Sequence, residues 1–169
     1  MDWKLFWLFL HILGAVLAFG PVFTFPIIGG MLRSEPRHIP FALRVQERIS
    51  RRLVAPLAIS MAVSGAGLVI AESINLRRTP WLGAGIILYV VAVAIAFGIL
   101  IPTGARMVAM SGAMPAPAPD AAPSGPPPEF LALIRRAQIF GGVTQLLFVV
   151  ILALMVWQPG GVVTGAIFG

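Results

Sequence analysis

The sequence predicts an all-α fold, an integral membrane bundle of four helices, on three observations. Apolar residues make up 59% of the 169 residues and charged residues only 11%, and the mean hydropathy is +0.96. Soluble domains carry about 25% charged residues, so this chain could not cover a globule with polar surface. Four stretches are long and apolar enough to cross a bilayer. Most of the basic residues fall in two of the three connections.

The four predicted spans are residues 5–24, 53–71, 81–101 and 137–157, and none contains Asp, Glu, Lys or Arg. Together they are expected to form a single domain over residues 1–169. Pro21 and Pro26 are expected to kink or end the first helix, although the apolar run continues. We expect the first span to be retained and not cleaved as a signal peptide, because Asp2 offsets Lys4 and the apolar run extends past any cleavage point.

The distribution of basic residues predicts the orientation. The first and third connections hold nine of the twelve basic residues: Arg33, Arg37, Arg44, Arg48, Arg51, Arg52, Arg106, Arg135 and Arg136. Basic residues mark cytoplasmic connections, so both termini are expected on the extracytoplasmic side of a bacterial inner membrane. Trp3, Trp7, Trp81 and Trp157 fall near that outer boundary, where indole rings are enriched.

The segment 39–52 has the pattern of an amphipathic helix lying on the cytoplasmic membrane surface. Phe41, Ala42, Val45 and Ile49 share one face at helical spacing. The other face carries basic residues that could meet anionic lipid or a partner: Arg44, Arg48, Arg51 and Arg52. The alternative is a connection that only sets topology. Nucleic-acid binding is not predicted, because no basic stretch is interleaved with exposed aromatic residues.

A cytoplasmic linker rich in proline and alanine is predicted over residues 111–128. Seven of these eighteen residues are proline, and most of the others are Ala, Gly and Ser. Such a composition forms neither helix nor sheet. Pro128 and Glu129 suit the first turn of the following helix.

Small and weakly polar residues predict where the helices touch. Lipid gives no hydrophobic drive for helix association, so close contact depends on small side chains and hydrogen bonds. The predicted packing residues are Gly14, Ala18, Ser60, Ser64, Gly67 and Gln145.

His11 is the histidine that falls within a predicted span, on a face shared with Gly14 and Ala18. An ionisable residue in the membrane is a functional candidate by default. A neutral imidazole can ligate haem iron, and a macrocycle would need the room that small neighbours leave. The alternative is a neutral histidine that hydrogen-bonds across the interface to Ser60, Ser64 or Gln145.

A bis-histidine haem b site is not predicted, because His38 lies in the first cytoplasmic connection and His11 near the outer side. A second axial ligand would be Met61, Met155 or none. Copper handling is a weaker hypothesis: Met107, Met110 and Met114 have a spacing suggestive of soft-metal capture. The alternative there is the end of an amphipathic helix.

Other catalytic patterns are missing from the sequence. Glu72 is isolated at the end of the second span, and no Gly-rich phosphate loop or Ser-His-Asp set can be assembled at one depth. Gln145, Thr144 and Tyr89 are interpreted as packing contacts.

Three stretches, WLFLHILGAVLAFGPVF, TPWLGAGIILYVVAVAIAFGILIPTGARM and LMVWQPG, resemble a known group. They are similar to the CopD-like superfamily of small bacterial membrane proteins, which includes copper-resistance protein D and the HemJ-type protoporphyrinogen oxidases. The nearest branch is that of predicted integral membrane proteins of unknown function. The resemblance implies a haem-binding role for His11. It does not extend to porphyrinogen oxidation, because the lysine that follows the Trp-Leu pair in HemJ-type relatives is absent after Trp81-Leu82, and Gln158-Pro159 replaces their Lys-Pro.

Two functions are carried forward from the sequence. The first is a non-catalytic structural or assembly subunit that packs against a larger membrane complex or a second copy of the chain. The second is a haem- or porphyrin-binding redox protein with His11 as axial ligand.

Overall fold

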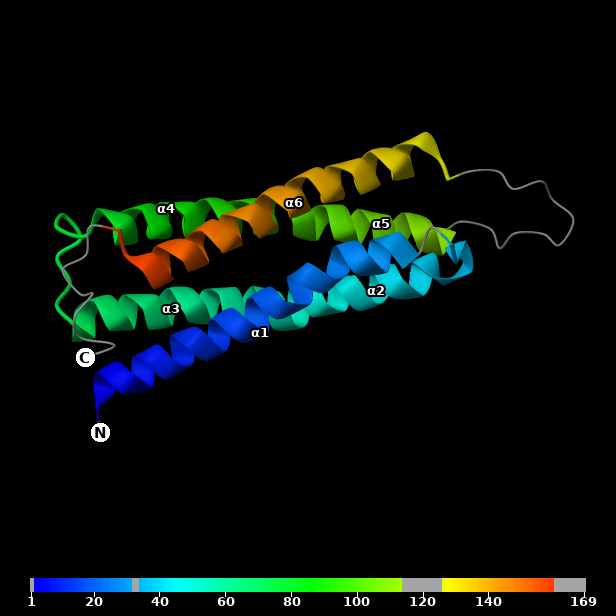
Figure 1. The fold of residues 1–169 in the computed structure, drawn as a ribbon. Helices are drawn as coiled ribbons and strands as arrows, with labels where there is room; N and C mark the ends of the chain where they lie inside the picture. The colour runs from blue at the N-terminus through cyan, green and yellow to red at the C-terminus, as the bar shows by residue number, and fades with distance from the viewer. Residues whose placement is uncertain (1, 32–33, 114–125, 160–169) are drawn as a thin grey trace, which may run out of the picture.

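The computed structural model describes residues 2–31, 34–113 and 126–159, and the regular structure in this part of the chain is helical throughout (Figure 1). This confirms the all-α prediction for the described residues. Two of the segments are π-helical turns, η2 and η3. The elements in chain order are α1 (Trp3–Met31), the 3₁₀ turn η1 (Pro36–His38), α2 (Ile39–Ile49), η2 (Ser50–Val54), α3 (Ala55–Ala71), α4 (Pro80–Ile95), η3 (Ala96–Leu100), α5 (Ile101–Ala113) and α6 (Pro128–Trp157).

Four continuous helices in this part of the chain are long and apolar enough to cross a membrane, which confirms the predicted number of spans. They run over Trp3–Met31, Ile39–Ala71, Pro80–Ala113 and Pro128–Trp157. Each is longer than the span predicted from hydropathy. Hydropathy detects where a helix is apolar, and these helices continue into charged sequence without a break. At about 1.5 Å per residue, the rods are roughly 44–51 Å long, well beyond the hydrocarbon thickness of about 30 Å.

The membrane-surface position predicted for the helix over 39–52 stays a prediction. A helix is present over Ile39–Ile49, but it continues through η2 into α3 as one rod and packs along α5 (Figure 1). Leu43 is buried against Met107 and Phe130, whereas Phe41, on the predicted apolar face, is 65% exposed. The side of this helix that packs inside the bundle therefore differs from the apolar face predicted from the sequence.

Each π-helical turn lies just before a proline. Pro56 follows η2 and Pro102 follows η3, each by two residues. A proline in a helix lacks an N–H, and its ring collides with the carbonyl four residues earlier. Those carbonyls belong to Arg52 and Gly98, which lie inside the two π turns. Widening the helix there accommodates the ring and lets the rod continue.

The helices associate mainly as pairs. α1 packs along α3, α4 along α6, and α2 along α5 (Figure 1). The start of α1, the end of α6 and the α3–α4 connection lie at one end of the bundle, and the α1–α2 turn lies at the other. At the first of these ends, Lys4 Nζ lies 2.8 Å from a Glu72 carboxylate oxygen, which ties α1 to α3.

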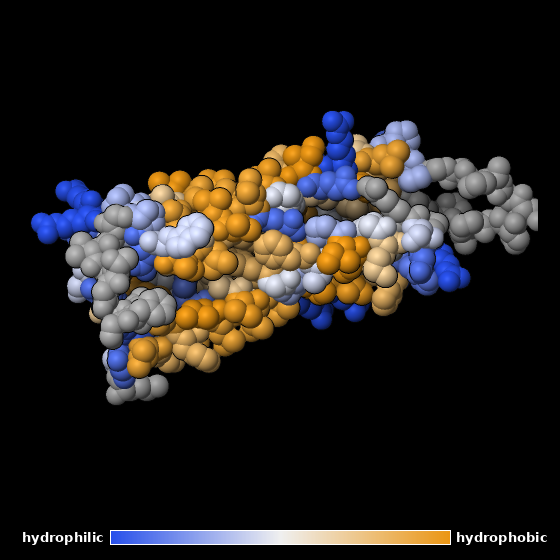
Figure 2. All heavy atoms as spheres, in the orientation of Figure 1, coloured by the Kyte–Doolittle hydropathy of each residue, from blue (hydrophilic) through white to orange (hydrophobic). Residues whose placement is uncertain are grey.

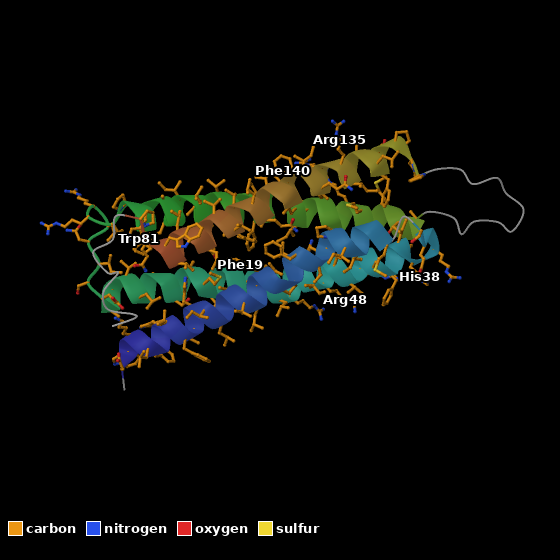
Figure 3. The ribbon with its side chains drawn as sticks, viewed as in Figure 1. Phe19, His38, Arg48, Trp81, Arg135 and Phe140 are labelled. Atoms are coloured by element: carbon orange, nitrogen blue, oxygen red, sulfur yellow. The ribbon has the colours of Figure 1, made fainter. Side chains whose placement is uncertain are left out.

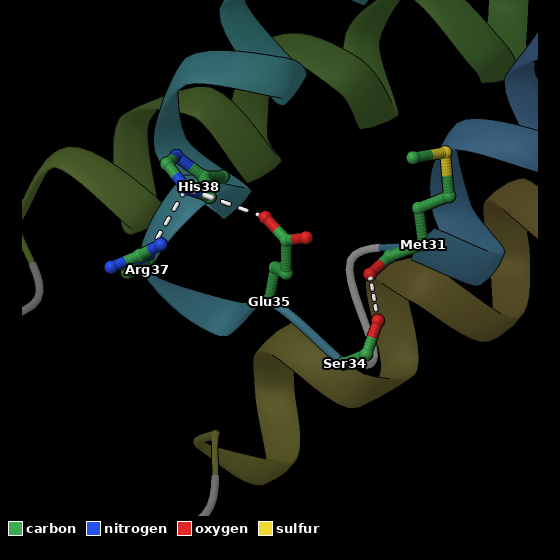
Figure 4. Close-up of polar contacts among 5 residues, drawn as sticks. All are labelled: Met31, Ser34, Glu35, Arg37 and His38. Carbon is green, nitrogen blue, oxygen red and sulfur yellow. Dashed lines mark hydrogen bonds and ion pairs between the residues drawn. The ribbon is translucent and has the colours of Figure 1, made fainter.

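The turn between α1 and α2 is held by local hydrogen bonds (Figure 4). The Ser34 hydroxyl donates to the Met31 carbonyl at 2.8 Å, and Arg37 Nε donates to His38 Nε2 at 3.0 Å. His38 is thus at the far end of α1 from His11. The twenty residues between His11 and Met31 alone correspond to roughly 30 Å of helix. The two histidines are therefore far apart, as the sequence predicted.

Two apolar clusters form the interior, one in each half of the rods. The first contains Leu43, Met107 and Phe130, from α2, α5 and α6. The second contains Ala92, Phe148 and Ile151, from α4 and α6. Phe19 of α1 stacks on Phe148, with ring centroids 4.0 Å apart and planes 19° from parallel (Figure 3). This stack joins the α1–α3 pair to the α4–α6 pair.

The outside of the bundle is apolar over a broad band (Figure 2). Ile70, Ile87, Leu146 and Val156 are between 64% and 78% exposed. Monomeric soluble proteins seldom expose contiguous apolar patches beyond a few hundred Å². Lipid or another membrane protein is therefore the environment that this surface requires.

The third connection is described only at its two ends. α5 continues to Ala113, so residues 111–113 of the linker predicted over 111–128 are helical. α6 begins at Pro128 with Glu129 in its first turn, as the sequence predicted. Residues 114–125 of the predicted linker lie outside the described residues.

Candidate functional site

The face of α1 that carries His11 lies against α3. His11 Nδ1 is 3.2 Å from the Ser64 hydroxyl oxygen, and that hydroxyl also lies 3.2 Å from the Met61 carbonyl. Ser64 is fully buried at 1% exposure, while His11 is half-buried. Of the partners considered for His11 in the sequence, the structure therefore brings Ser64 to it. This pair joins two spans, α1 and α3.

The glycines near His11 allow the two backbones to approach. A Cβ atom on Gly14 would lie 2.9 Å from Met61 Cγ, and one on Gly67 would lie 2.5 Å from the Trp7 ring. A Cβ on Gly65 would lie 3.3 Å from His11 Cε1. The space opposite each small residue is therefore already filled by a side chain of the facing helix.

A haem does not fit this arrangement. The room that Gly14 was expected to leave is taken by Met61, and Ala18 is covered to 1% exposure. Met155, the other methionine considered as a ligand, packs against Gly85 in the α4–α6 pair. The side chains around His11 thus form a close helix contact with no slot for a macrocycle.

Ser60 was predicted as a packing residue, and this requires correction. Its side chain is exposed on the outside of α3, whereas Ser64, one helical turn later, faces α1. Both serines suit a packing position by residue type. Side chains four residues apart share a face only approximately, and the position of α1 decides which of the two is covered.

A second polar contact between spans involves Gln145 and the backbone of α1. Gln145 Nε2 donates to the Val22 carbonyl at 3.0 Å. In an uninterrupted helix this carbonyl would accept from the N–H of residue 26, but residue 26 is a proline and has none. Gln145 supplies the missing donor, so α1 continues through Pro26 and does not end there. The sequence predicted Gln145 as a packing residue but did not connect it with Pro26.

The link between Gln145 and Pro26 gives a testable prediction. Gln145→Leu is expected to lower the free energy of unfolding by about 0.5–1.5 kcal/mol, because it leaves a carbonyl unpaired in an apolar environment. In a Pro26→Ala background the alanine N–H can pair with Val22, so the same change should cost less. The free energy of unfolding in mixed micelles is measured for the wild-type chain, the two single variants and the double variant. Equal costs in both backgrounds would contradict the link.

Two side chains of α4, those of Tyr89 and Trp81, carry polar groups inside the bundle. The Tyr89 hydroxyl donates to the Ala58 carbonyl of α3. Trp81 Nε1 is buried and has no hydrogen-bond partner among the described residues (Figure 3). Tyr89 therefore connects the α4–α6 pair to the α1–α3 pair, as Gln145 and the Phe19–Phe148 stack also do.

The methionines considered for copper do not form an open site in the described part of the chain. Met107 is buried between Leu43 and Phe130, and Met110 packs at the edge of the same cluster. Met114 lies outside the described residues. No group of three or more His, Cys, Asp or Glu side chains among the described residues is placed to hold a metal ion.

The four basic residues assigned to lipid or partner contact lie on the surface. Arg44, Arg48, Arg51 and Arg52 are all exposed. Arg51 Nε is 2.5 Å from a Glu47 carboxylate oxygen, so that arginine is paired within its own helix.

Comparison with known proteins decides the family. Residues 5–159 match the family described as "Predicted integral membrane protein (DUF2269)". The chain belongs to this family. No curated protein and no solved structure matches it. The wider resemblance to CopD-like proteins remains a prediction.

The DUF2269 match covers all four spans and both described connections, so the membrane assignment applies to the whole bundle. Several polar side chains inside this DUF2269 protein make contacts between helices or with their own backbone. Thr144, for example, donates to the Phe140 carbonyl at 2.8 Å. Chemically, such groups hold helices in register.

Proposed function

We propose that this DUF2269 protein is a non-catalytic subunit of a membrane assembly, whose spans pack against another membrane protein. One observation carries the proposal: His11, Gln145 and Tyr89, three polar residues of the spans, form contacts within the bundle, and the outer surface is apolar. His11 contacts Ser64, Gln145 contacts Val22 and Tyr89 contacts Ala58. An arrangement in which polar groups hold helices together suits a structural or assembly role.

The level of the arginines supports a placement for the membrane. Arg48 and Arg135 lie at the same level along the rods (Figure 3). From Arg136 to Trp157 the helix rises roughly 32 Å, and from Arg52 to Glu72 roughly 30 Å, close to the hydrocarbon thickness of about 30 Å. We therefore put one boundary at the arginines and the other at the end that carries Trp157.

With that placement, the rods extend beyond the membrane on the arginine side. α2, most of α5 and the first turns of α6 form this extension around Leu43, Met107 and Phe130. Basic residues favour the cytoplasm, so the extension is cytoplasmic and both termini are extracytoplasmic, in a bacterial inner membrane. Arg44 and the 65% exposed Phe41 lie on the outside of the extension and are available to a partner or to lipid headgroups.

In-cell photo-cross-linking tests the proposed role. A photoreactive amino acid replaces one lipid-exposed residue at a time: Val16 in α1, Ile87 in α4 or Leu146 in α6, each at least 63% exposed. We expect one of these faces to give a defined adduct with a second membrane protein or a second copy of the chain. Adducts with lipid alone at all three positions would contradict the proposal.

An absorption spectrum of the purified full chain tests the redox alternative. Because the His11 contact leaves no slot for a macrocycle, we expect no Soret band from cells with ample haem. A Soret band that is lost in His11→Ala would contradict the proposal and replace it with haem binding.

A further inference from the structure

A small hollow on the surface of the bundle lies where η3 meets α5, beside α6. Its lining residues are Gly98, Ile99, Pro102, Thr103, Arg106 and Arg136. We propose that this hollow binds the phosphate of an anionic lipid headgroup between Arg106 and Arg136. The inference rests on the membrane placement proposed above and goes beyond it by assigning a ligand site.

The shape of the hollow follows from the local sequence. Gly98, Pro102 and Arg106 are spaced four residues apart and therefore follow one another along one face of the rod. Gly98 has no side chain, and a Cβ there would meet no atom within 4 Å. Thr103, only 3% exposed, lies at the base. Small residues thus leave an open space next to the guanidinium of Arg106.

The charges around the hollow favour an anion. The ion pairs among the described residues use Lys4, His38 and Arg51, and none involves Arg106 or Arg136. Two guanidinium groups from different helices that line one hollow repel each other, and an anion between them relieves that repulsion. The planar fork of arginine donors also matches phosphate oxygens.

The surroundings favour a lipid over free phosphate. Phe97, which precedes Gly98, is 41% exposed, and Ile139, about one turn beyond Arg136, is 52% exposed. Both lie on the membrane side of the arginines in the proposed placement. A headgroup phosphate in the hollow would therefore bring its acyl chains onto apolar surface, a contact that free phosphate cannot make. Basic pockets between spans at the cytoplasmic boundary are a known setting for anionic headgroups.

Native mass spectrometry of the full chain in mild detergent tests the site. The probes are phosphatidylglycerol, zwitterionic phosphatidylcholine and inorganic phosphate, each titrated separately. The test variant is Arg106→Gln with Arg136→Gln. The control is Arg77→Gln with Arg78→Gln, which removes the same charge from the α3–α4 connection at the opposite end of the bundle.

We expect the wild-type chain and the control to retain phosphatidylglycerol in preference to phosphatidylcholine. In the test variant, the affinity for phosphatidylglycerol should fall at least about tenfold. Gly98→Leu, which keeps both arginines but fills the hollow, should give the same loss even if the double variant folds poorly.

Three results would overturn the proposal: equal loss in the test and control variants, retention by Gly98→Leu, or inorganic phosphate that competes as well as the lipid. The photo-cross-linking at Leu146 is independent of this site. If lipid binding fails while the adduct with a membrane protein persists, the subunit role stands and only the lipid site is wrong.

Discussion

Phe130→Ala is expected to lower the free energy of unfolding by about 3–5 kcal/mol, the usual cost of removing a buried aromatic side chain. Phe130 is 1% exposed and packs in one cluster with Leu43 of α2 and Met107 of α5. In the proposed placement this cluster lies outside the hydrocarbon layer, where an unburied ring would meet water. Burial of the ring therefore contributes the full hydrophobic free energy. Unfolding of the full chain in mixed micelles measures the change, and hydrogen exchange should show faster opening of α2, α5 and the start of α6.

Phe41→Ala is the matched control for this prediction. Phe41 belongs to the same extension, but its ring is 65% exposed. Its removal should change stability by no more than about 0.5 kcal/mol. If the two variants have similar effects, or if Phe130→Ala leaves exchange in α2 unchanged, the cluster does not hold the extension together.

The second large effect is expected from Gly67→Leu. A Cβ at this position would lie 2.5 Å from the Trp7 ring, so leucine must push α1 away from α3. Overpacking of this kind typically costs about 1–3 kcal/mol. Because His11 and Ser64 lie between the same helices, their contact should also be lost. Cross-linking of a cysteine pair placed across α1 and α3 reports the separation, since the native chain contains no cysteine.

Two further variants separate the clash from other effects of the substitution. Gly142→Leu adds the same side chain at a helix position where a Cβ would meet nothing within 4 Å, and it should be nearly neutral. Trp7→Ala should restore part of the stability of Gly67→Leu, because it removes the ring that the leucine meets. A destabilised Gly142→Leu, or no recovery with Trp7→Ala, would show that the clash is not the cause.

The number of spans could be predicted from the sequence, but their ends could not. Hydropathy identifies the apolar part of each helix, and the charged segments that continue the rods carry no such signal. The segment 39–52 shows the difficulty. The spacing of Phe41, Ala42, Val45 and Ile49 marks one apolar side of the helix, but the side that packs against α5 and α6 is the one with Leu43. Only the tertiary arrangement distinguishes the two.

The contacts of the candidate site were partly predictable. Ser64 was among the expected partners of His11, because small hydroxyl residues suit helix contacts. The bond from Gln145 to Val22 was not predicted, although Pro26 carried the signal: a proline in a span leaves a carbonyl that needs another donor. Which side of α3 faces α1 depends on the rotation of α3 about its axis. A single sequence does not determine that rotation, so it could not show that Ser60 points outward.

Cysteine accessibility along α6 in intact cells and inverted membrane vesicles tests the membrane placement most directly. Single cysteines would replace exposed residues at positions 131, 135, 143, 146, 150 and 157, probed with a membrane-impermeant maleimide. We predict that positions 131 and 135 react only in inverted vesicles, that 157 reacts only in intact cells, and that 143, 146 and 150 are protected. Reaction at the three central positions, or reaction of both ends from the same side, would contradict a bundle that spans the membrane with its arginines at the cytoplasmic boundary.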